Sequence, residues 1–428
     1  MTQVFISHSS RSDPLAEQVR ERLSKGLTEK NYEVKVDTDA LKPGEDWCPT
    51  LYKWLAECDA AVILFNQEAI DSFWVRREVN ILMWRRALNP GLLIIPVLIG
   101  GLTSSVLKDN GFSDVLPVEF ARTHPEVPDE TAVEQLVNQV LEEFGALPDL
   151  SGEPDSMRKW IGVIADYLER THKKTALTEA GRALGIADEY LLNLDAQAGV
   201  GQFLAQQMLD AAPGSHLMGA VWKIAPHLDG DSLQRLITQV TPAWISGEVA
   251  RHILPPVLGD ASHRRTVALN ACESGTARQF VDRAMCLDFG HYWIGAAGGV
   301  PVGEDLVLET LDQCFSAVRR ILGLPPDWPL EKLRIRPDCF HFLTLAMHKL
   351  KPETVAEVVE ELHRVVPQLI IILLTGDNPS TAEALRECRL DEVIVLSPPL
   401  GPDEETLGFQ LAHDLRSIPD RLNGFGGN

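Results

Sequence analysis

Residues 60–65 read Ala-Ala-Val-Ile-Leu-Phe, an apolar run without any polar position. Such a run is typical of a parallel strand that is covered on both faces, because a half-exposed strand alternates apolar and polar residues. Further apolar segments at 3–7, 32–36 and 92–98 are separated from it by segments of helical period, and a weaker one occurs at 115–120. This alternation of strands and helices predicts an α/β fold with a parallel sheet and helices on both faces.

The loops that follow the predicted strands are the expected place for a binding site. In parallel sheets, ligands bind beside the carboxyl ends of the strands. The loops after Ser7, Asp37, Asn66 and Leu98 lie at that edge. Functional side chains are therefore expected in these loops and at the starts of the helices that follow them.

The segment SFWVRRE at 72–78 places a carboxylate beside an apolar helix face. Trp74 and Glu78 are four residues apart, so in a helix both point to the same side. A buried carboxylate next to an aromatic ring is typical of a functional site. The alternative is that Glu78 forms a surface ion pair with Arg77 or Arg85, which would carry no function.

Composition and charge exclude several classes of protein. The net charge of −22 disfavours a protein that coats DNA or RNA, because phosphate contacts need a basic face. No apolar run reaches the about 18 residues of a membrane span, and the N-terminus lacks the pattern of a signal peptide. The seven cysteines include no CxxC pair, so neither a disulfide framework nor a zinc site is expected. These observations predict a cytoplasmic protein without a bound metal and without membrane or bulk nucleic-acid partners.

A chain of 428 residues is too long for one ordinary core, and two or three domains are expected. We predict a first α/β domain at 1–146 and a linker at 147–155, where proline, glycine and acidic residues follow a helix. Helical period then predicts a helical connector at 156–262. Strand–helix alternation returns at 263–428 and predicts a second, Rossmann-like α/β region, interpreted as a sensor or regulatory domain.

The first domain resembles the Toll/interleukin-1 receptor (TIR) domain. Three segments carry the resemblance, in the order and at the spacing usual for the family: VFISHSS at 4–10, PGEDW at 43–47 and SFWVRRE at 72–78. The resemblance implies a flavodoxin-like fold. It also implies cleavage of NAD+, since many bacterial TIR domains hydrolyse this molecule, with Glu78 as the catalytic residue. The family often has a cysteine after the tryptophan, but Val75 stands there, so a thiol has no role at that position.

The predicted chemistry is cleavage of the bond between nicotinamide and ribose through an oxocarbenium-like state. A carboxylate can hold the ribose hydroxyls and stabilise the developing positive charge. Nicotinamide is already a cationic leaving group, so a second carboxylate is not needed, and NAD+ is the substrate rather than a cofactor. Local alternatives remain, since the serines can cap the next helix and the tryptophans can belong to the core. By the resemblance, the substrate pocket is lined by His8, Ser9, Ser10, Arg11, Trp47 and Trp74.

A second class of function stays open. Many TIR domains only bind other TIR domains, so the chain is alternatively a non-catalytic assembly adaptor that recruits another effector. Both interpretations imply a homo-oligomer formed through TIR domains, because the loop at Pro43 is the usual contact in the family.

Two interpretations compete for residues 263–428. In outline they are similar to the SAVED domain, a sensor of cyclic oligonucleotides, with ligand loops expected at 298–299 and 375–378. The expected positive charges are Arg319, Arg320, Arg334 and Arg336.

The second interpretation starts from residues 269–275, which resemble the strand-end cysteine motif of CHAT proteases. A cysteine nucleophile needs a histidine base, and no upstream histidine has the setting usual in that family. The histidines considered are His227, His252 and His263. Cys272 is therefore expected to be an ordinary buried residue.

Together these observations predict a signal-activated NAD+ hydrolase that acts as an antiphage immune effector. Ligand-driven oligomerisation, with a cyclic oligonucleotide as the activator, would stack the TIR domains into a filament and complete the site around Glu78. About two thirds of the chain shows no catalytic set of its own, which favours a regulatory role for that part.

Overall fold

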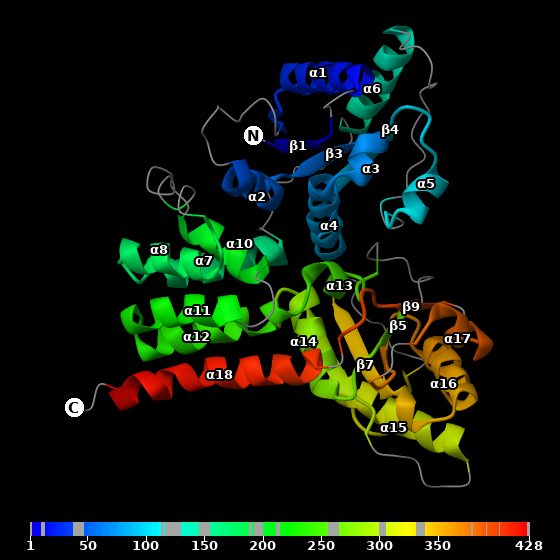
Figure 1. Cartoon of the computed structure of the whole chain (residues 1–428). Helices are drawn as coiled ribbons and strands as arrows, with labels where there is room; N and C mark the ends of the chain where they lie inside the picture. The colour runs from blue at the N-terminus through cyan, green and yellow to red at the C-terminus, as the bar shows by residue number, and fades with distance from the viewer. Residues whose placement is uncertain are drawn as a thin grey trace. The chain divides into compact units, whose positions relative to one another are not determined.

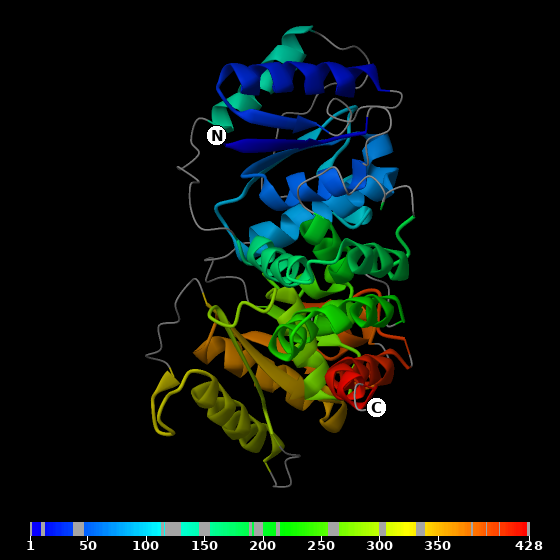
Figure 2. The same ribbon diagram turned by 90° about the vertical axis from the view of Figure 1, so that its left-hand side faces the viewer.

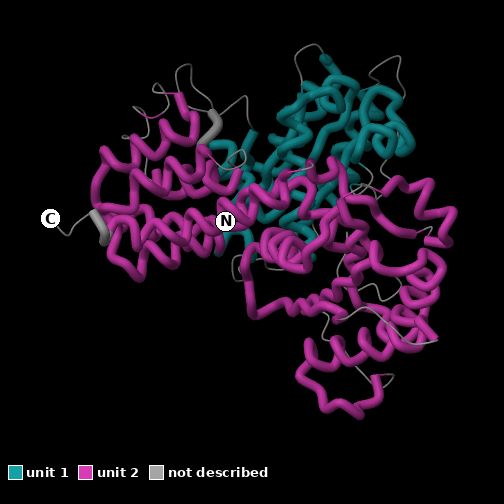
Figure 3. The backbone as a smooth tube through the Cα atoms, turned by 60° about the horizontal axis from the view of Figure 1, so that its bottom comes forward, with its two compact units in different colours: residues 1–159 teal, residues 160–428 magenta. Residues whose placement is uncertain are grey.

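The computed structural model describes most of the chain in two compact units, residues 1–159 and 160–428 (Figure 3). Side chains are described throughout these ranges except at 47–49 and 423–425. The described residues are 2–9, 13–36, 47–112, 115, 130–144, 155–187, 191, 200–210, 215–255, 265–298, 305–330, 339–377, 380–390, 392–401 and 403–425.

The first unit contains a parallel sheet of four described strands in the order β2-β1-β3-β4. Its strands are β1 (Gln3–Ser7), β2 (Glu33–Val36), β3 (Ala60–Phe65) and β4 (Leu93–Leu98). Its helices are α1 (Pro14–Glu29), α2 (Trp47–Glu57), α3 (Gln67–Asp71), α4 (Phe73–Leu88), α5 (Ser104–Asp109) and α6 (Glu130–Phe144). Figures 1 and 2 show α1 and α6 on one side of the sheet and α3 and α4 on the other.

The uninterrupted apolar run of β3 is explained by two separate cores. Ala61, Ile63 and Phe65 pack into the core beneath α4, and the alternate residues of β3 pack into the core beneath α1 and α6. All six residues of β3 are buried. The predicted α/β architecture of this unit is therefore confirmed, and its sequence pattern follows from burial on both faces. Of the predicted strand at 115–120, Val115 lies in a short turn and 116–120 lie outside the described residues.

The second unit combines helices with another parallel sheet. The chain enters it along α7 (Ser156–Glu169), which crosses the boundary between the units. The helices that follow are α8 (Lys174–Ala183), α10 (Val200–Asp210), α11 (Ser215–Ile224), α12 (Gly230–Val240) and α13 (Gly247–Arg251), with short 3₁₀ turns η3 (Ala225–His227) and η4 (Thr241–Trp244). The last helix, α18 (Glu404–Phe425), returns to pack beside α11 and α12 (Figure 1).

The sheet of the second unit has five described strands in the order β6-β7-β8-β5-β9, all parallel. Its strands are β5 (Arg265–Leu269), β6 (Tyr292–Ala296), β7 (Phe340–Ala346), β8 (Ile370–Leu374) and β9 (Val393–Val395). Its helices are α14 (Ser274–Ala284), α15 (Leu306–Ile321), α16 (Pro352–Val365) and α17 (Ala382–Glu387), with the turn η6 (Met347–Lys349). This arrangement confirms the prediction of a second α/β region.

The strand order reverses between β5 and β8. The chain leaves β5 toward one edge strand, β6, and leaves β8 toward the other edge strand, β9. The loops after these two neighbouring strands therefore diverge, and they define the switch point at the carboxyl edge of this sheet. The predicted boundaries at 146, 155 and 262 stay predictions. Among the described helices, none has the length and apolar character needed to cross a bilayer.

Candidate functional site

The candidate site lies at the carboxyl edge of the first sheet, where β1 and β3 diverge toward opposite edge strands. Glu78 is in the second turn of α4 and is only 2% exposed. Ser7, the last residue of β1, is 1% exposed, and its hydroxyl donates to Oε2 of Glu78 at 2.5 Å. The two residues are 71 positions apart, so the fold alone brings this hydroxyl to the carboxylate.

Local sequence explains why α4 presents Glu78 to the sheet. Ser72 caps the helix by accepting a hydrogen bond from the backbone N–H of Val75 at 3.3 Å. Val75, Glu78 and Val79 share the buried side of the helix, as the period of the sequence predicted. The alternative placed Glu78 at the helix surface, and that placement is wrong because the side chain is buried.

The loop after β1 is fastened to the end of β3 by Asn66. The side-chain amide of Asn66 donates to the carbonyl of Ser9 at 2.9 Å and to Oδ2 of Asp13 at 3.0 Å. Its Oδ1 accepts from the N–H of Ala69 at 2.8 Å, which caps α3. Asp13 in turn caps α1 by accepting from Leu15 and Ala16. One asparagine therefore connects the ends of two strands and the starts of two helices at the switch point.

The predicted site residues are distributed as follows. His8 is buried and directly follows Ser7, and Ser9 is positioned by Asn66. Trp74 is half-buried, packs against the core beneath α4, and meets the ring of Phe73 edge-on at 5.6 Å. The remaining predictions lie outside the described residues: Ser10, Arg11 and the loop at 43–46 entirely, and Trp47 in its side chain.

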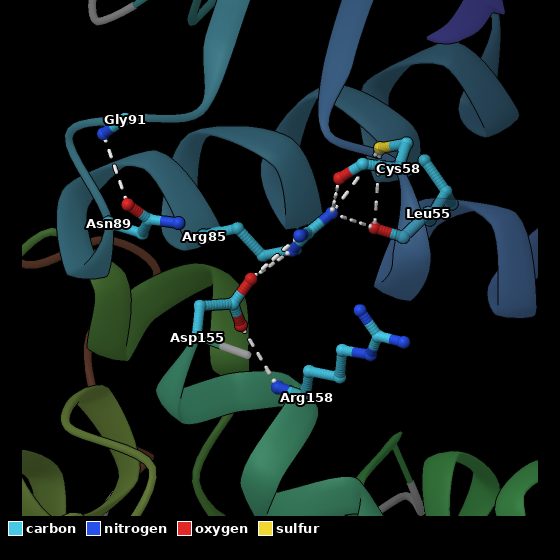
Figure 4. A network of polar contacts seen from close by, with 7 residues as sticks. All are labelled: Leu55, Cys58, Arg85, Asn89, Gly91, Asp155 and Arg158. Atoms are coloured by element: carbon cyan, nitrogen blue, oxygen red, sulfur yellow. Dashed lines mark hydrogen bonds and ion pairs between the residues drawn. The ribbon is translucent and has the colours of Figure 1, made fainter. Parts of the chain in front are cut away.

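A buried network holds the other end of α4 (Figure 4). The guanidinium of Arg85 pairs with Oδ2 of Asp155 at 2.6 Å and donates to the carbonyls of Leu55 and Cys58 at 2.6 and 3.0 Å. The other carboxylate oxygen of Asp155 caps α7 by accepting from the N–H of Arg158 at 3.0 Å. Burial raises the pKa of the Cys58 thiol, so Cys58 faces Arg85 as a neutral group and Asp155 supplies the negative charge.

A second polar cluster occupies the switch point of the other sheet. The thiol of Cys272 donates to Oδ1 of Asp377 at 3.2 Å, and the thiol, Asp377 and Glu405 offer three donor atoms within 4.8 Å of one another. Glu405 also accepts from the N–H groups of Cys272 and Glu273 at 3.0 and 3.1 Å and from the hydroxyl of Thr276. A thiol and two carboxylates can ligate a divalent cation. Here Glu405 already accepts hydrogen bonds from the two residues that precede α14 and from Thr276 in its first turn.

The expectation that Cys272 is an ordinary buried residue is wrong, because it is partly exposed at this switch point. The hydrogen bond to Asp377 raises the pKa of the Cys272 thiol, which favours the neutral thiol over the thiolate nucleophile. The partner of the thiol is thus a carboxylate rather than the histidine base that a cysteine peptidase requires. Of the histidines considered, His263 lies outside the described residues.

Two of the four arginines expected to serve the strand-end loops are located elsewhere. Arg319 and Arg320 lie in the last turn of α15, which leads to the start of β7. A crossover helix runs antiparallel to its strands, so these arginines are at the edge opposite to Asp377. Arg334 and Arg336 lie outside the described residues, as do Gly299 and Asn378.

The first unit thus has the flavodoxin-like class of fold, with a buried carboxylate at its switch point. Residues 4–137 match the family model of the TIR domain, so a TIR domain is present at those positions. This agrees with the three segments that carried the resemblance. A comparison with curated proteins finds no match to this chain.

Sequence reasoning missed Ser7 as the partner of Glu78, although it lies within the first of the three segments. The available signal was a short hydroxyl residue at the end of a strand, at the edge where ligands bind. It also missed Asn66, which a loop assignment could have suggested as the cap of α3.

Proposed function

We propose that this protein cleaves the nicotinamide–ribose bond of NAD+, with Glu78 as the catalytic carboxylate. TIR domains include NAD-cleaving enzymes, and residues 4–137 match the family model of the TIR domain. The observation that supports the proposal most directly is the burial of Glu78 at the carboxyl edge of the sheet. A carboxylate that served only solubility would lie at the surface.

The role of Glu78 follows from the charge that develops in the reaction. As nicotinamide departs, positive charge grows on the ribose, and a nearby carboxylate stabilises it most strongly where water is excluded. Water then attacks the ribose carbon to give ADP-ribose, or an intramolecular attack gives a cyclised product. Nicotinamide leaves as a neutral molecule, so the step needs no general acid.

The burial of Glu78 supports regulation as well as catalysis. A side chain that is 2% exposed is shielded from a substrate as large as NAD+ until its neighbours move. We propose that oligomerisation through TIR domains produces this change and that the second unit controls it. Activation by a cyclic oligonucleotide, a cytoplasmic location and an antiphage role belong to the same proposal. The described switch point of the second sheet adds no support for an anionic signal, because it carries Asp377 and Glu405.

The test is loss of NAD+ in the presence of the purified full chain. Wild type is compared with Glu78→Gln, which keeps the shape of the side chain and removes its charge. Reactions run with and without a panel of cyclic di- and trinucleotides, and at several protein concentrations to allow assembly. The matched control is Glu29→Gln, an exposed carboxylate at the end of α1 that faces the opposite edge of the sheet. NAD+ loss that requires Glu78 but tolerates Glu29→Gln supports the proposal, and equal loss in all variants refutes it.

One observation favours the adaptor as a second candidate function. Phe73, at the start of α4, is 64% exposed, and its ring meets the half-buried ring of Trp74 edge-on at 5.6 Å. An exposed ring at this position suits a contact with another protein. If NAD+ is stable under all conditions while Phe73→Ser abolishes self-association measured by light scattering, the adaptor interpretation replaces the enzyme.

A further inference from the structure

We propose that Ser7 is a positioning residue for the reaction, and that its hydroxyl fixes the orientation and the ionised state of Glu78. This inference rests on the proposed cleavage of NAD+ at Glu78. It starts from one contact, the 2.5 Å hydrogen bond from Oγ of Ser7 to Oε2 of Glu78.

The two ends of this hydrogen bond belong to rigid elements. β1 is an inner strand, paired with β2 on one side and with β3 on the other, and Ser7 lies in register with Ile63 of β3. Glu78 follows the capped first turn of α4, which the core holds on both sides of this residue through Val75 and Val79. Because neither backbone can shift easily, the hydroxyl limits rotation of the carboxylate about its last side-chain bond.

The same hydrogen bond offsets the cost of burying a charge. A carboxylate with 2% exposure loses most of its hydration, which disfavours the anion. A hydroxyl that donates to the carboxylate favours the anion, and such charge-assisted bonds are short and strong. The reaction needs the anion, because a neutral carboxyl group stabilises positive charge on the ribose poorly. Ser7 therefore holds the carboxylate of Glu78 in one orientation and favours its charged form.

Serine is the residue type that fits this task at the end of β1. Its hydroxyl is carried on a single carbon and reaches the carboxylate from a position that is itself 1% exposed. Threonine keeps the donor and adds a methyl group at a buried position. Cysteine keeps the shape but is a weak donor, and alanine removes the donor altogether. These three substitutions separate the hydrogen bond from the packing.

The competing explanation is that Ser7 only satisfies a buried acceptor and so contributes to folding. A purely structural role would lower stability without changing the pH dependence of the active enzyme. The chain offers a control in the second unit, where the hydroxyl of buried Ser232 donates to Oδ2 of the exposed Asp229 at 2.7 Å. Ser232→Ala removes the same kind of hydroxyl–carboxylate bond away from the TIR domain.

The experiment measures kcat and KM for NAD+ from pH 5 to 9, together with the melting temperature, on the full chain. The variants are Ser7→Ala, Ser7→Cys, Ser7→Thr and Ser232→Ala, under the conditions in which wild type cleaves NAD+. We expect Ser7→Ala to lower kcat by about 10- to 100-fold, as misplacement of a reacting group does, with little change in KM. The acidic limb of the kcat profile should move upward by about one to two pH units, since the anion loses a donor. Ser7→Cys should show the same shift of the acidic limb, although it keeps the shape of the side chain. Ser7→Thr keeps the donor and should retain most of the wild-type pH profile.

The outcomes separate this inference from the proposed function. Wild-type protein that fails to cleave NAD+ under every condition overturns both. If wild type is active and both Ser7→Ala and Ser7→Cys keep the wild-type kcat and pH profile, only the role of Ser7 is overturned and the proposed function stands. A loss of activity that tracks melting temperature only, as in Ser232→Ala, also overturns it, because it assigns Ser7 to folding.

Discussion

Replacing Asp155 by asparagine should destabilise the first unit far more than the loss of an ordinary surface charge. The side chains of Arg85 and Asp155 are 5% and 1% exposed, and their closest atoms are 2.6 Å apart. Asparagine keeps the shape of Asp155 but leaves the Arg85 guanidinium as a buried charge without its counter-ion. Removing one partner of a buried pair typically costs about 3–5 kcal/mol. For a unit of 159 residues, this corresponds to a fall in melting temperature of roughly 6–20 °C.

The assay is calorimetric unfolding of the full chain, with hydrogen exchange of β1 and β3 peptides to identify the transition of the first unit. The exposed pair of Arg22 and Glu130, 3.4 Å apart, provides the control, and Glu130→Gln should cost less than about 1 kcal/mol. A double variant, Arg85→Met with Asp155→Leu, should recover much of the loss, because it removes both charges. The reasoning is refuted if Asp155→Asn costs no more than Glu130→Gln, or if the double variant is less stable than Asp155→Asn.

Two further predictions concern the second unit. Gly408→Ala should lower the free energy of unfolding by about 1–3 kcal/mol, because the added Cβ would lie 2.6–2.8 Å from the ring of Trp244. Gly162→Ala is the control, since a Cβ at this position of α7 meets open space, and it should raise the free energy of unfolding by about 0.5–1 kcal/mol. Urea titration of both variants measures the difference. Burial lowers the pKa of His341 to about 4. Between about pH 6.5 and 4 the unfolded chain therefore binds a proton at this histidine and the folded chain does not. The stability of the fold should fall progressively as the pH drops through this range. His341→Phe, which keeps a ring against Trp293, should flatten this pH dependence by up to about 3 kcal/mol, and an unchanged slope would contradict the assignment.

The fold was predictable wherever a local pattern determines burial. The apolar run at 60–65 became β3, and the Asp13–Pro14 pair became the cap and first residue of α1. The burial of Glu78 also followed from the helical period around it. These features depend on residues that are close together in the chain, so the local sequence is enough to predict them.

The contacts that complete the site were not predictable in this way. Ser7 and Glu78 are 71 residues apart, and Arg85 and Asp155 are 70 apart. Their pairing depends on the crossover topology and on which side of a strand each side chain faces. Asp155 was assigned to a linker because proline, glycine and acidic residues precede it, yet its side chain is buried. The composition of a segment predicts only its average exposure to solvent, so it does not reveal that one carboxylate, Asp155, is buried.

The two unpredicted contacts meet on one helix. Glu78 and Arg85 are seven residues apart, which places both on the same side of α4 and about 10 Å apart along its axis. The first is held by the end of β1, and the second by the residue that caps the start of α7. Asp155 directly precedes α7, so a buried ion pair within the first unit joins the start of α7 to α4. The Asp155→Asn variant therefore tests more than stability: it removes the charged connection between the start of α7 and the helix that carries Glu78.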